Sequence, residues 1–180
     1  AAERAGVRRL VHVSIANATA APHLPYYAGK AALEESVKAS SMSHAIIRPT
    51  VIFGDEDILI NNIAWILRKL PVFGAPGDGS YRMRPIFVED MAKLAVSLAA
   101  RDDNVTVDAV GPETFTFDEW LRLLATTVGS RTRILHLPPM LALSASRAIG
   151  LLMRDVVLTS DEVKGLMADL LVTDGTSTGD

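Results

Sequence analysis

The stretch VHVSIANATAAPHLPYYAGKAALEESVKASSMSHAIIRPTVIFG, residues 11–54, decides the fold predicted for this chain. A strand over 9–14 leads through a polar loop into a helix that opens at Pro25, and a second strand then ends at Pro49. Proline suits the first turn of a helix and cannot extend a central strand, so the two prolines mark a start and an end. A strand, a helix and a second strand in this order predict an α/β protein with a parallel sheet.

The composition is that of a globular domain. Of the 180 residues 49% are hydrophobic, and a formal net charge of −3 provides no broad basic field for nucleic acid. Without cysteine there is no thiol nucleophile or thiolate metal site, and the four histidines are scattered. We therefore expect no metal and no nucleic-acid partner. The absence of cysteine fits the cytoplasm, and no apolar run is long enough to span a bilayer, so we expect a cytoplasmic protein or, alternatively, one associated with a membrane surface.

Tyr26 and Lys30 are the candidate chemical pair. They stand four residues apart on the predicted helix and share one face, so a phenol and an ammonium can act on the same small molecule. Ser14 ends the preceding strand, and the loop after it lies at the carboxyl end of the sheet, where open α/β sheets bind ligands. The alternative is that Tyr26 is a partly buried aromatic residue and Lys30 an exposed charge.

The rest of the chain predicts further helices and strands. We expect helices over 58–70 and 89–99, a turn-rich loop over 73–81, and strands over 84–88 and 105–110. Capping boxes at Thr116-x-x-Glu119 and Thr159-x-x-Glu162 predict two more helix starts. Between these boxes, a helix from about Met140 to Leu152 is buried or interfacial, or alternatively faces a membrane or a hydrophobic substrate.

Several other side chains have expected structural roles. His12, midway along an apolar strand, is expected to be a hydrogen-bonded core histidine, and Tyr27 a packing residue. Trp65 and Trp120 lie on apolar helix faces and are expected in the core. Arg84 has the reach to contact an anionic group of a substrate from the loop before its strand.

Four motifs in order resemble the extended and atypical short-chain dehydrogenase/reductases. They are Ser14 after a strand, Tyr26-x-x-x-Lys30 on a helix, IRPTVIFG at 47–54, and PIFVED at 85–90. Within that group the chain is similar to the branch that contains the nucleotide-binding accessory subunit of respiratory complex I and bacterial epimerase/dehydratase-like proteins. The resemblance runs from Val7 to about Val172.

The resemblance implies a Rossmann-type, doubly wound parallel sheet. The chain would carry the second half of that sheet, with a small, mostly helical C-terminal region on the substrate side. Residues 1–54 would be the sheet half with the Tyr-x-x-x-Lys helix, and 55–172 the remaining strands and helical region of the same domain. Residues 173–180 are expected to form a flexible tail, because they are polar and rich in glycine.

The resemblance also implies NAD or NADP as cofactor, with a small-molecule substrate. Tyr26 would donate or accept a proton at the substrate oxygen. Lys30 would hold the nicotinamide ribose hydroxyls and lower the tyrosine pKa, as an ammonium beside a phenol does. Ser14 would be the third catalytic group. Three residues would line the nicotinamide through backbone groups: Pro49, Thr50 and Val51.

Two departures from the family pattern leave two functions open. Active members hold a Ser or Thr hydroxyl a residue or two after the Ser14 position, where this chain has Ala16 and Asn17. No G-x-G-x-x-G follows a strand, so we expect an upstream portion of about 90 residues and weak or no dinucleotide binding by these 180 residues alone. The chain is then an NAD(P)-binding reductase or epimerase-like protein acting on a carbonyl or hydroxyl group. The alternative is a non-catalytic nucleotide-binding subunit for assembly or stability of a respiratory or quinone-related complex, associated peripherally with that complex or its membrane.

Overall fold

The structure, a computed structural model, describes residues 2–144, 160–176 and 178–179. The chain forms two compact units that interleave along the sequence. Unit 1 comprises Ala1–Ile52, Arg84–Glu113 and Leu170–Asp180, and unit 2 comprises Phe53–Met83 and Thr114–Asp169. The predicted helix from Met140 to Leu152 is described only over 139–144, which is helical, and the predicted cap at Thr159 lies outside the described residues.

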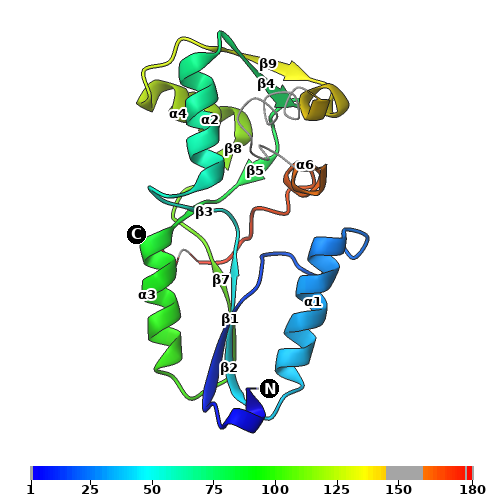
Figure 1. Ribbon diagram of the computed structural model, residues 1–180, viewed down its shortest axis with the longest axis vertical. Helices are drawn as coiled ribbons and strands as arrows, with labels where there is room; N and C mark the ends of the chain where they lie inside the picture. The colour runs from blue at the N-terminus through cyan, green and yellow to red at the C-terminus, as the bar shows by residue number, and fades with distance from the viewer. Residues whose placement is uncertain (1, 145–159, 177, 180) are drawn as a thin grey trace. The chain divides into compact units, whose positions relative to one another are not determined.

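A three-stranded parallel sheet forms the centre of unit 1. Its strand order is β1-β2-β7, with Val11 opposite Ala45 and Ala45 opposite Val105. Helix α1 covers one face of this sheet and helix α3 the other (Figure 1). The elements of this sandwich are β1 (Arg9–Val13), α1 (Pro25–Lys38), β2 (Ser43–Pro49), α3 (Val88–Ala99) and β7 (Val105–Ala109).

The sheet face toward α3 is an apolar core. Ala45, Ile47 and Ala109 of the sheet pack with Met91 and Leu98 of the helix. The central strand β2 has its middle residues fully shielded from solvent, as expected for a parallel strand covered on both faces. Shorter elements of the same region are η1 (Glu3–Ala5), β3 (Ile52–Phe53) and β6 (Ile86–Phe87). The helical turn η1 ends at Gly6, which has a left-handed φ of 70°.

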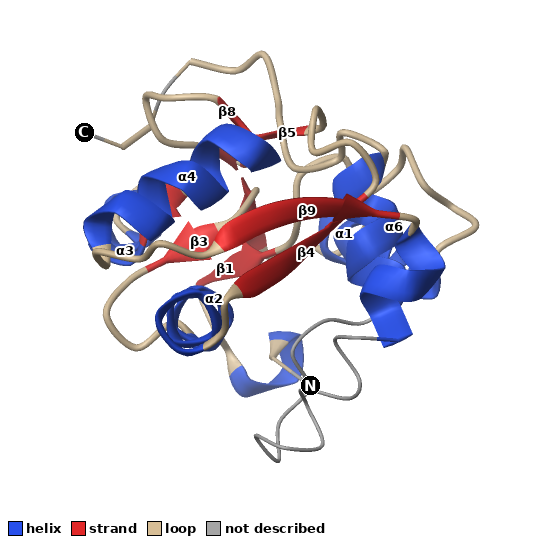
Figure 2. Ribbon diagram, turned by 90° about the horizontal axis from the view of Figure 1, so that it is seen from above, coloured by secondary structure: helices blue, strands red, loops and turns tan. Residues whose placement is uncertain are grey.

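In the part of unit 2 that the structure describes, two pairs of short strands lie with helices α2, α4 and α6. Strand β4 runs parallel to β9, and β5 runs antiparallel to β8 (Figure 2). The capping box at Thr116 and Glu119 is present and starts α4, as the sequence predicted. The elements are α2 (Ile58–Lys69), β4 (Val72–Pro76), β5 (Arg82–Met83), β8 (Phe115–Thr116), α4 (Phe117–Thr127), β9 (Arg133–Leu137) and α6 (Ser160–Met167).

The prediction of a loop over 73–81 was wrong at its beginning. Val72–Pro76 is a strand, and its partner β9 was not predicted as a strand either. The two pair across some 60 residues of sequence, with Gly74 opposite Leu135. A Cβ added at Gly74 would lie 2.6 Å from Leu137 Cδ1, so the glycine that suggested a turn instead allows close packing in the sheet.

The segment expected to be a flexible tail is bound to unit 1. Arg84 donates through its guanidinium to the carbonyls of Thr173 and Gly175, and also to Gly111 O at 2.7 Å. The Val110 amide donates to Thr178 Oγ1 at 3.0 Å. Arg84 is therefore used to hold backbone, and the expectation that it would reach an anionic substrate group is corrected.

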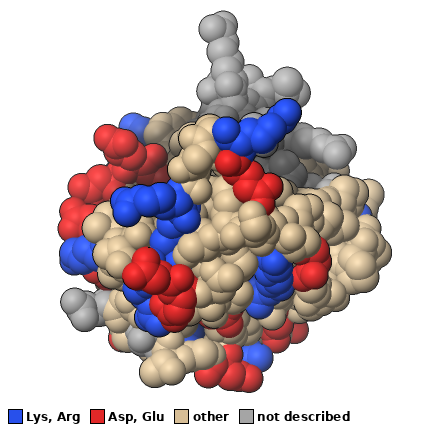
Figure 3. All heavy atoms as spheres, turned by 90° about the horizontal axis from the view of Figure 1, so that it is seen from below, with Lys and Arg blue, Asp and Glu red and all other residues tan. Residues whose placement is uncertain are grey.

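Charges of both signs are interspersed on the face shown in Figure 3, without a broad region of one sign. In the part of the chain that the structure describes, no helix is long and apolar enough to cross a membrane. The same residues contain no group of three or more histidine and acidic side chains placed to hold a metal ion.

Candidate functional site

Tyr26 and Lys30 lie in the first turns of α1, and Tyr26 is 53% exposed. The Lys30 ammonium stands 5.8 Å from the centre of the Tyr26 ring, within the range of a cation–π contact. The same ammonium donates to the carbonyl of Val13 at 3.2 Å. Because Val13 is the last residue of β1, the pair stands at the carboxyl end of a parallel strand, where α/β sheets bind ligands.

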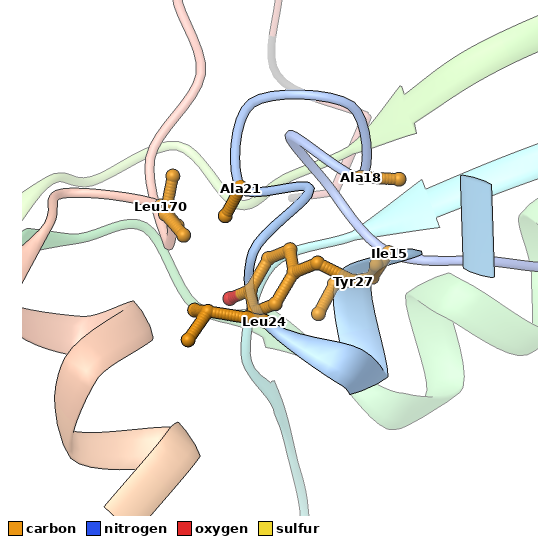
Figure 4. Packing of buried hydrophobic residues seen from close by; sticks show 6 residues of the cluster. All are labelled: Ile15, Ala18, Ala21, Leu24, Tyr27 and Leu170. Atoms are coloured by element: carbon orange, nitrogen blue, oxygen red, sulfur yellow. The ribbon is translucent and has the colours of Figure 1, made fainter. Parts of the chain in front are cut away.

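Tyr27 is a packing residue, as predicted. Its side chain is 4% exposed and lies in a cluster with Leu24 and Leu170 (Figure 4). Burial raises the pKa of the Tyr27 hydroxyl, so this phenol stays neutral. Since Tyr27 anchors the start of α1, Tyr26 is the tyrosine presented outward. The other members of the cluster are Ile15, Ala18 and Ala21.

The Ser14 hydroxyl is hydrogen-bonded to a buried carboxylate. Its side chain is buried, and its hydroxyl donates to Glu34 Oε1 at 2.6 Å. Arg48 binds the same carboxylate through both Nε, at 2.9 Å from Oε1, and Nη2, at 2.5 Å from Oε2. The Glu34 side chain is 1% exposed, so α1 is tied to the ends of β1 and β2 by a buried charged group.

The ionised form of Glu34 is favoured despite its burial. Burial by itself would raise the pKa of this carboxyl, but the hydrogen bonds from Arg48 and Ser14 and the charges of Arg48 and Lys38 outweigh it. The pKa of Glu34 therefore lies below its ordinary value. Glu34 and Arg48 were not predicted as site residues. A usable signal was present, because Tyr26, Lys30 and Glu34 repeat every four residues and share one helix face.

His12 was predicted to be a hydrogen-bonded core histidine, and the structure does not show the expected hydrogen bond at Nε2. Among the described residues its buried Nε2 has no hydrogen-bond partner. Burial first, and the positive charge of Lys30 second, lower the pKa of His12. The neutral imidazole is thus the stable form in the folded protein at neutral pH.

The two positions after Ser14 carry no hydroxyl and have structural roles. Ala16 is completely buried. Asn17 has a left-handed φ of 55°, and its side-chain amide donates at 2.9 Å to the carbonyls of both Leu170 and Val172. The side chain of Asn17 is therefore used to bind the C-terminal segment.

Pro49, Thr50 and Val51 lie together at the carboxyl end of β2. The Pro49 carbonyl accepts from the Ala16 amide, and the Val51 carbonyl from the Ile86 amide, both at 2.8 Å. The Thr50 hydroxyl donates to the carbonyl of Arg84. The structure thus brings these residues to the same end of the sheet as Tyr26 and Lys30. The Thr50 hydroxyl, like that of Ser14, already has a partner within the protein.

Comparison with curated proteins finds relatives along most of the chain, although no family model matches it. The mitochondrial NADH dehydrogenase [ubiquinone] 1 alpha subcomplex subunit 9 of Arabidopsis thaliana is 26% identical over 186 residues, covering 97% of this chain and 46% of the relative. The NADH-ubiquinone oxidoreductase 40 kDa subunit of Neurospora crassa is 25% identical, covering 92% and 44%. A ceramide reductase of Caulobacter vibrioides is 30% identical over 141 residues, covering 77% and 44%.

Solved structures with the same fold include two that contain a bound dinucleotide. An NADPH-dependent quinone oxidoreductase of Escherichia coli, in complex with NADPH, superposes with a TM-score of 0.77 at 18% identity, covering 96% of this chain and 60% of that one. A UDP-glucuronic acid 4-epimerase of Bacillus cereus, in complex with NAD, gives a TM-score of 0.68 at 14% identity, covering 94% and 63%. At these identities the likeness establishes the fold.

The parallel sheet with helices on both faces and the matching solved structures define a Rossmann-type α/β protein, which confirms the predicted fold. Within that class, the chain is similar along most of its length to the subunit 9 protein and the 40 kDa subunit of mitochondrial NADH dehydrogenase. It spans somewhat less than half the length of these curated relatives.

Proposed function

We propose that the chain carries the nicotinamide-side part of an NAD(P)-binding, reductase-like or epimerase-like protein that acts on a carbonyl or hydroxyl group. The position of the Lys30 ammonium, between the Tyr26 ring and the Val13 carbonyl at the end of β1, carries this proposal. The ceramide reductase relative and the NADPH-bound and NAD-bound structural neighbours support the same class of activity.

The two side chains fit the proposed cofactor and chemistry. An ammonium has three N–H donors, and the bond to Val13 uses one, which leaves donors for the hydroxyls of a ribose. The exposed Tyr26 hydroxyl can give a proton to a substrate oxygen or take one from it. A bound nicotinamide would supply or accept the hydride. Pro49, Thr50 and Val51 would contribute backbone contacts along its ring.

Calorimetric titration of NADPH and NADH against the full-length gene product tests this proposal. Lys30→Ala should weaken binding at least about tenfold, because it removes charge-assisted hydrogen bonds. Lys93→Ala is the matched control, since this lysine is exposed on α3 and pairs with Asp90. Tyr26→Phe should leave binding intact and abolish turnover. Unchanged affinity in Lys30→Ala would contradict the assignment of this site.

A second function is favoured by the commitment of Ser14 to Glu34 and by the lack of a hydroxyl at Ala16 and Asn17. In this alternative the protein binds the nucleotide without turnover and serves the assembly or stability of a respiratory or quinone-related complex. The subunit 9 relatives support it. Peripheral association with a membrane, from the cytoplasmic side, belongs to this alternative.

Native electrophoresis of membranes from cells that carry each variant separates the two functions. In the assembly role, Lys30→Ala should reduce the amount of the mature complex and Tyr26→Phe should not, because only the first weakens nucleotide binding. If both variants leave every membrane complex at its normal level while Tyr26→Phe abolishes turnover, the protein is an enzyme.

A further inference from the structure

Two segments of unit 2 form a fixed junction. Thr132 Oγ1 lies 2.6 Å from the carbonyl oxygens of both Leu67 and Leu70 at the end of α2, and the Ser130 hydroxyl also donates to Leu67 O. The connection from α4 to β9 accordingly passes the end of α2 (Figure 1). These hydrogen bonds therefore hold the backbones of the two segments next to one another.

The junction surrounds a hollow with a basic rim. Residues 67–71 and 128–133 line a shallow pocket of about 580 Å³, and no acidic residue is among them. The rim includes four exposed basic side chains, and none of them makes an ion pair with a carboxylate within the described residues: Arg68, Lys69, Arg131 and Arg133.

Stabilisation of a helix end accounts for only two of these four basic residues. Arg68 and Lys69 stand in the last turn of α2, where positive charge suits the negative end of the helix dipole. Arg131 and Arg133 follow α4 and lie outside any helix, so the dipole does not account for them. By contrast, Arg122 on α4 pairs with Asp118 at 2.7 Å. Four like charges held together repel each other unless an anion neutralises them.

We propose that this hollow binds a phosphate-bearing anion, either a soluble phosphate ester or the headgroup of an anionic lipid. The planar guanidinium of arginine donates paired hydrogen bonds that match phosphate oxygens. The hollow also has an apolar part, because Leu70, Pro71 and Val128 are among the residues that line it. This site is independent of the proposed function of Tyr26 and Lys30.

Binding measurements on the whole chain test the site. Pyrophosphate is titrated by calorimetry, and vesicles of phosphatidylcholine with or without phosphatidylglycerol are tested by co-sedimentation. The double substitution Arg131→Gln with Arg133→Gln should weaken binding at least about tenfold. Arg4→Gln with Arg8→Gln changes the net charge by the same amount at exposed positions of unit 1, and should change binding less than about twofold.

Each outcome decides the proposal. Binding of pyrophosphate alone identifies a soluble phosphate ester, and binding of anionic vesicles alone identifies a lipid headgroup. A second pair, Arg68→Gln with Lys69→Gln, should weaken binding in the same direction, which guards against a folding defect in the first. No binding of either probe, or equal loss in the Arg4 and Arg8 control, would overturn the proposal.

Discussion

At the scale of single residues, the carboxylate of Glu34 needs partners within unit 1, because it is both charged and buried. Removing a carboxylate from water costs several kcal/mol unless partners replace the lost hydration. Here Ser14 and Arg48 provide that replacement from two different strand ends. The arrangement fixes the helix that presents Tyr26 and Lys30, and it also explains why the Ser14 hydroxyl is not free for chemistry.

Removing Arg48 alone should reduce the free energy of unfolding much more than removing Arg48 and Glu34 together. Arg48→Met leaves Glu34 buried and unpaired, so we expect a loss of about 3 kcal/mol in the free energy of unfolding. Adding Glu34→Leu should recover most of that loss. Urea unfolding followed by circular dichroism measures both, with Lys93→Met, at an exposed position of α3, as a control that should change stability by less than about 0.5 kcal/mol. Equal stability of the single and double variants would contradict this account.

The same carboxylate should make stability depend on pH in the acid range. The folded pKa of Glu34 lies below the unfolded value of about 4.3. Its contribution is therefore complete above that value and is lost as pH falls toward the folded pKa. Unfolding midpoints measured from pH 6 to pH 3 should fall less steeply for Glu34→Gln than for the unmodified protein. Parallel curves for the two proteins would rule out Glu34 as a source of the acid sensitivity.

At the scale of elements, local chemistry determines where helices begin. Pro25 occupies the first turn of α1, and Thr116 with Glu119 starts α4, so both starts could be predicted from sequence. Strands β4 and β9 could not, because each is five residues long and becomes a strand only by pairing with the other. For such elements the deciding interaction is distant in sequence, and the local glycine points to a turn instead.

The start of α2 provides a test of this local control. Asp57 caps the helix by accepting from the Ile60 amide at 2.6 Å. Asp57→Ala should reduce the free energy of unfolding by about 1 kcal/mol, and Asp57→Ser, which keeps a capping oxygen, by less. Tryptophan fluorescence is the suitable measurement, since Trp65 and Trp120 both lie in unit 2. Equal loss in the two variants would mean that the charge of Asp57, and not its capping bond, stabilises the helix.

At the scale of the whole molecule, the site was predictable in part. The spacing of Tyr26 and Lys30 is local, and the structure places them at the carboxyl end of the sheet with Pro49, Thr50 and Val51 nearby. The partners of Ser14 and Asn17 are not local, because one bonds to a helix 20 residues away and the other to a segment 153 residues away. Similarly, the predicted regions, divided at 54 and 172, are each continuous in sequence. The two compact units are each built from segments that are separated in sequence.

Removing residues 170–180 should destabilise unit 1. Asn17 would lose both acceptors of its side-chain amide, and Arg84 would lose the carbonyls of Leu171, Thr173 and Gly175. At about 1 kcal/mol for each hydrogen bond, we expect a loss of at least about 3 kcal/mol. Hydrogen exchange of the amides in β1 and β7 should accelerate accordingly. Asn17→Gly keeps the left-handed backbone, removes only two of these bonds, and should have a smaller effect.

The use of Leu170 and the residues after it to complete unit 1 has a consequence for synthesis of the protein. A ribosome adds roughly 5–20 residues per second, so this segment emerges several seconds after Glu113, which ends the preceding part of the unit. During that interval the nascent chain exposes the amide of Asn17, the guanidinium of Arg84 and the apolar surface around Tyr27. Unit 1 is therefore completed only after the residues of unit 2 have been made, and this interval is when chaperones and proteases have access to it.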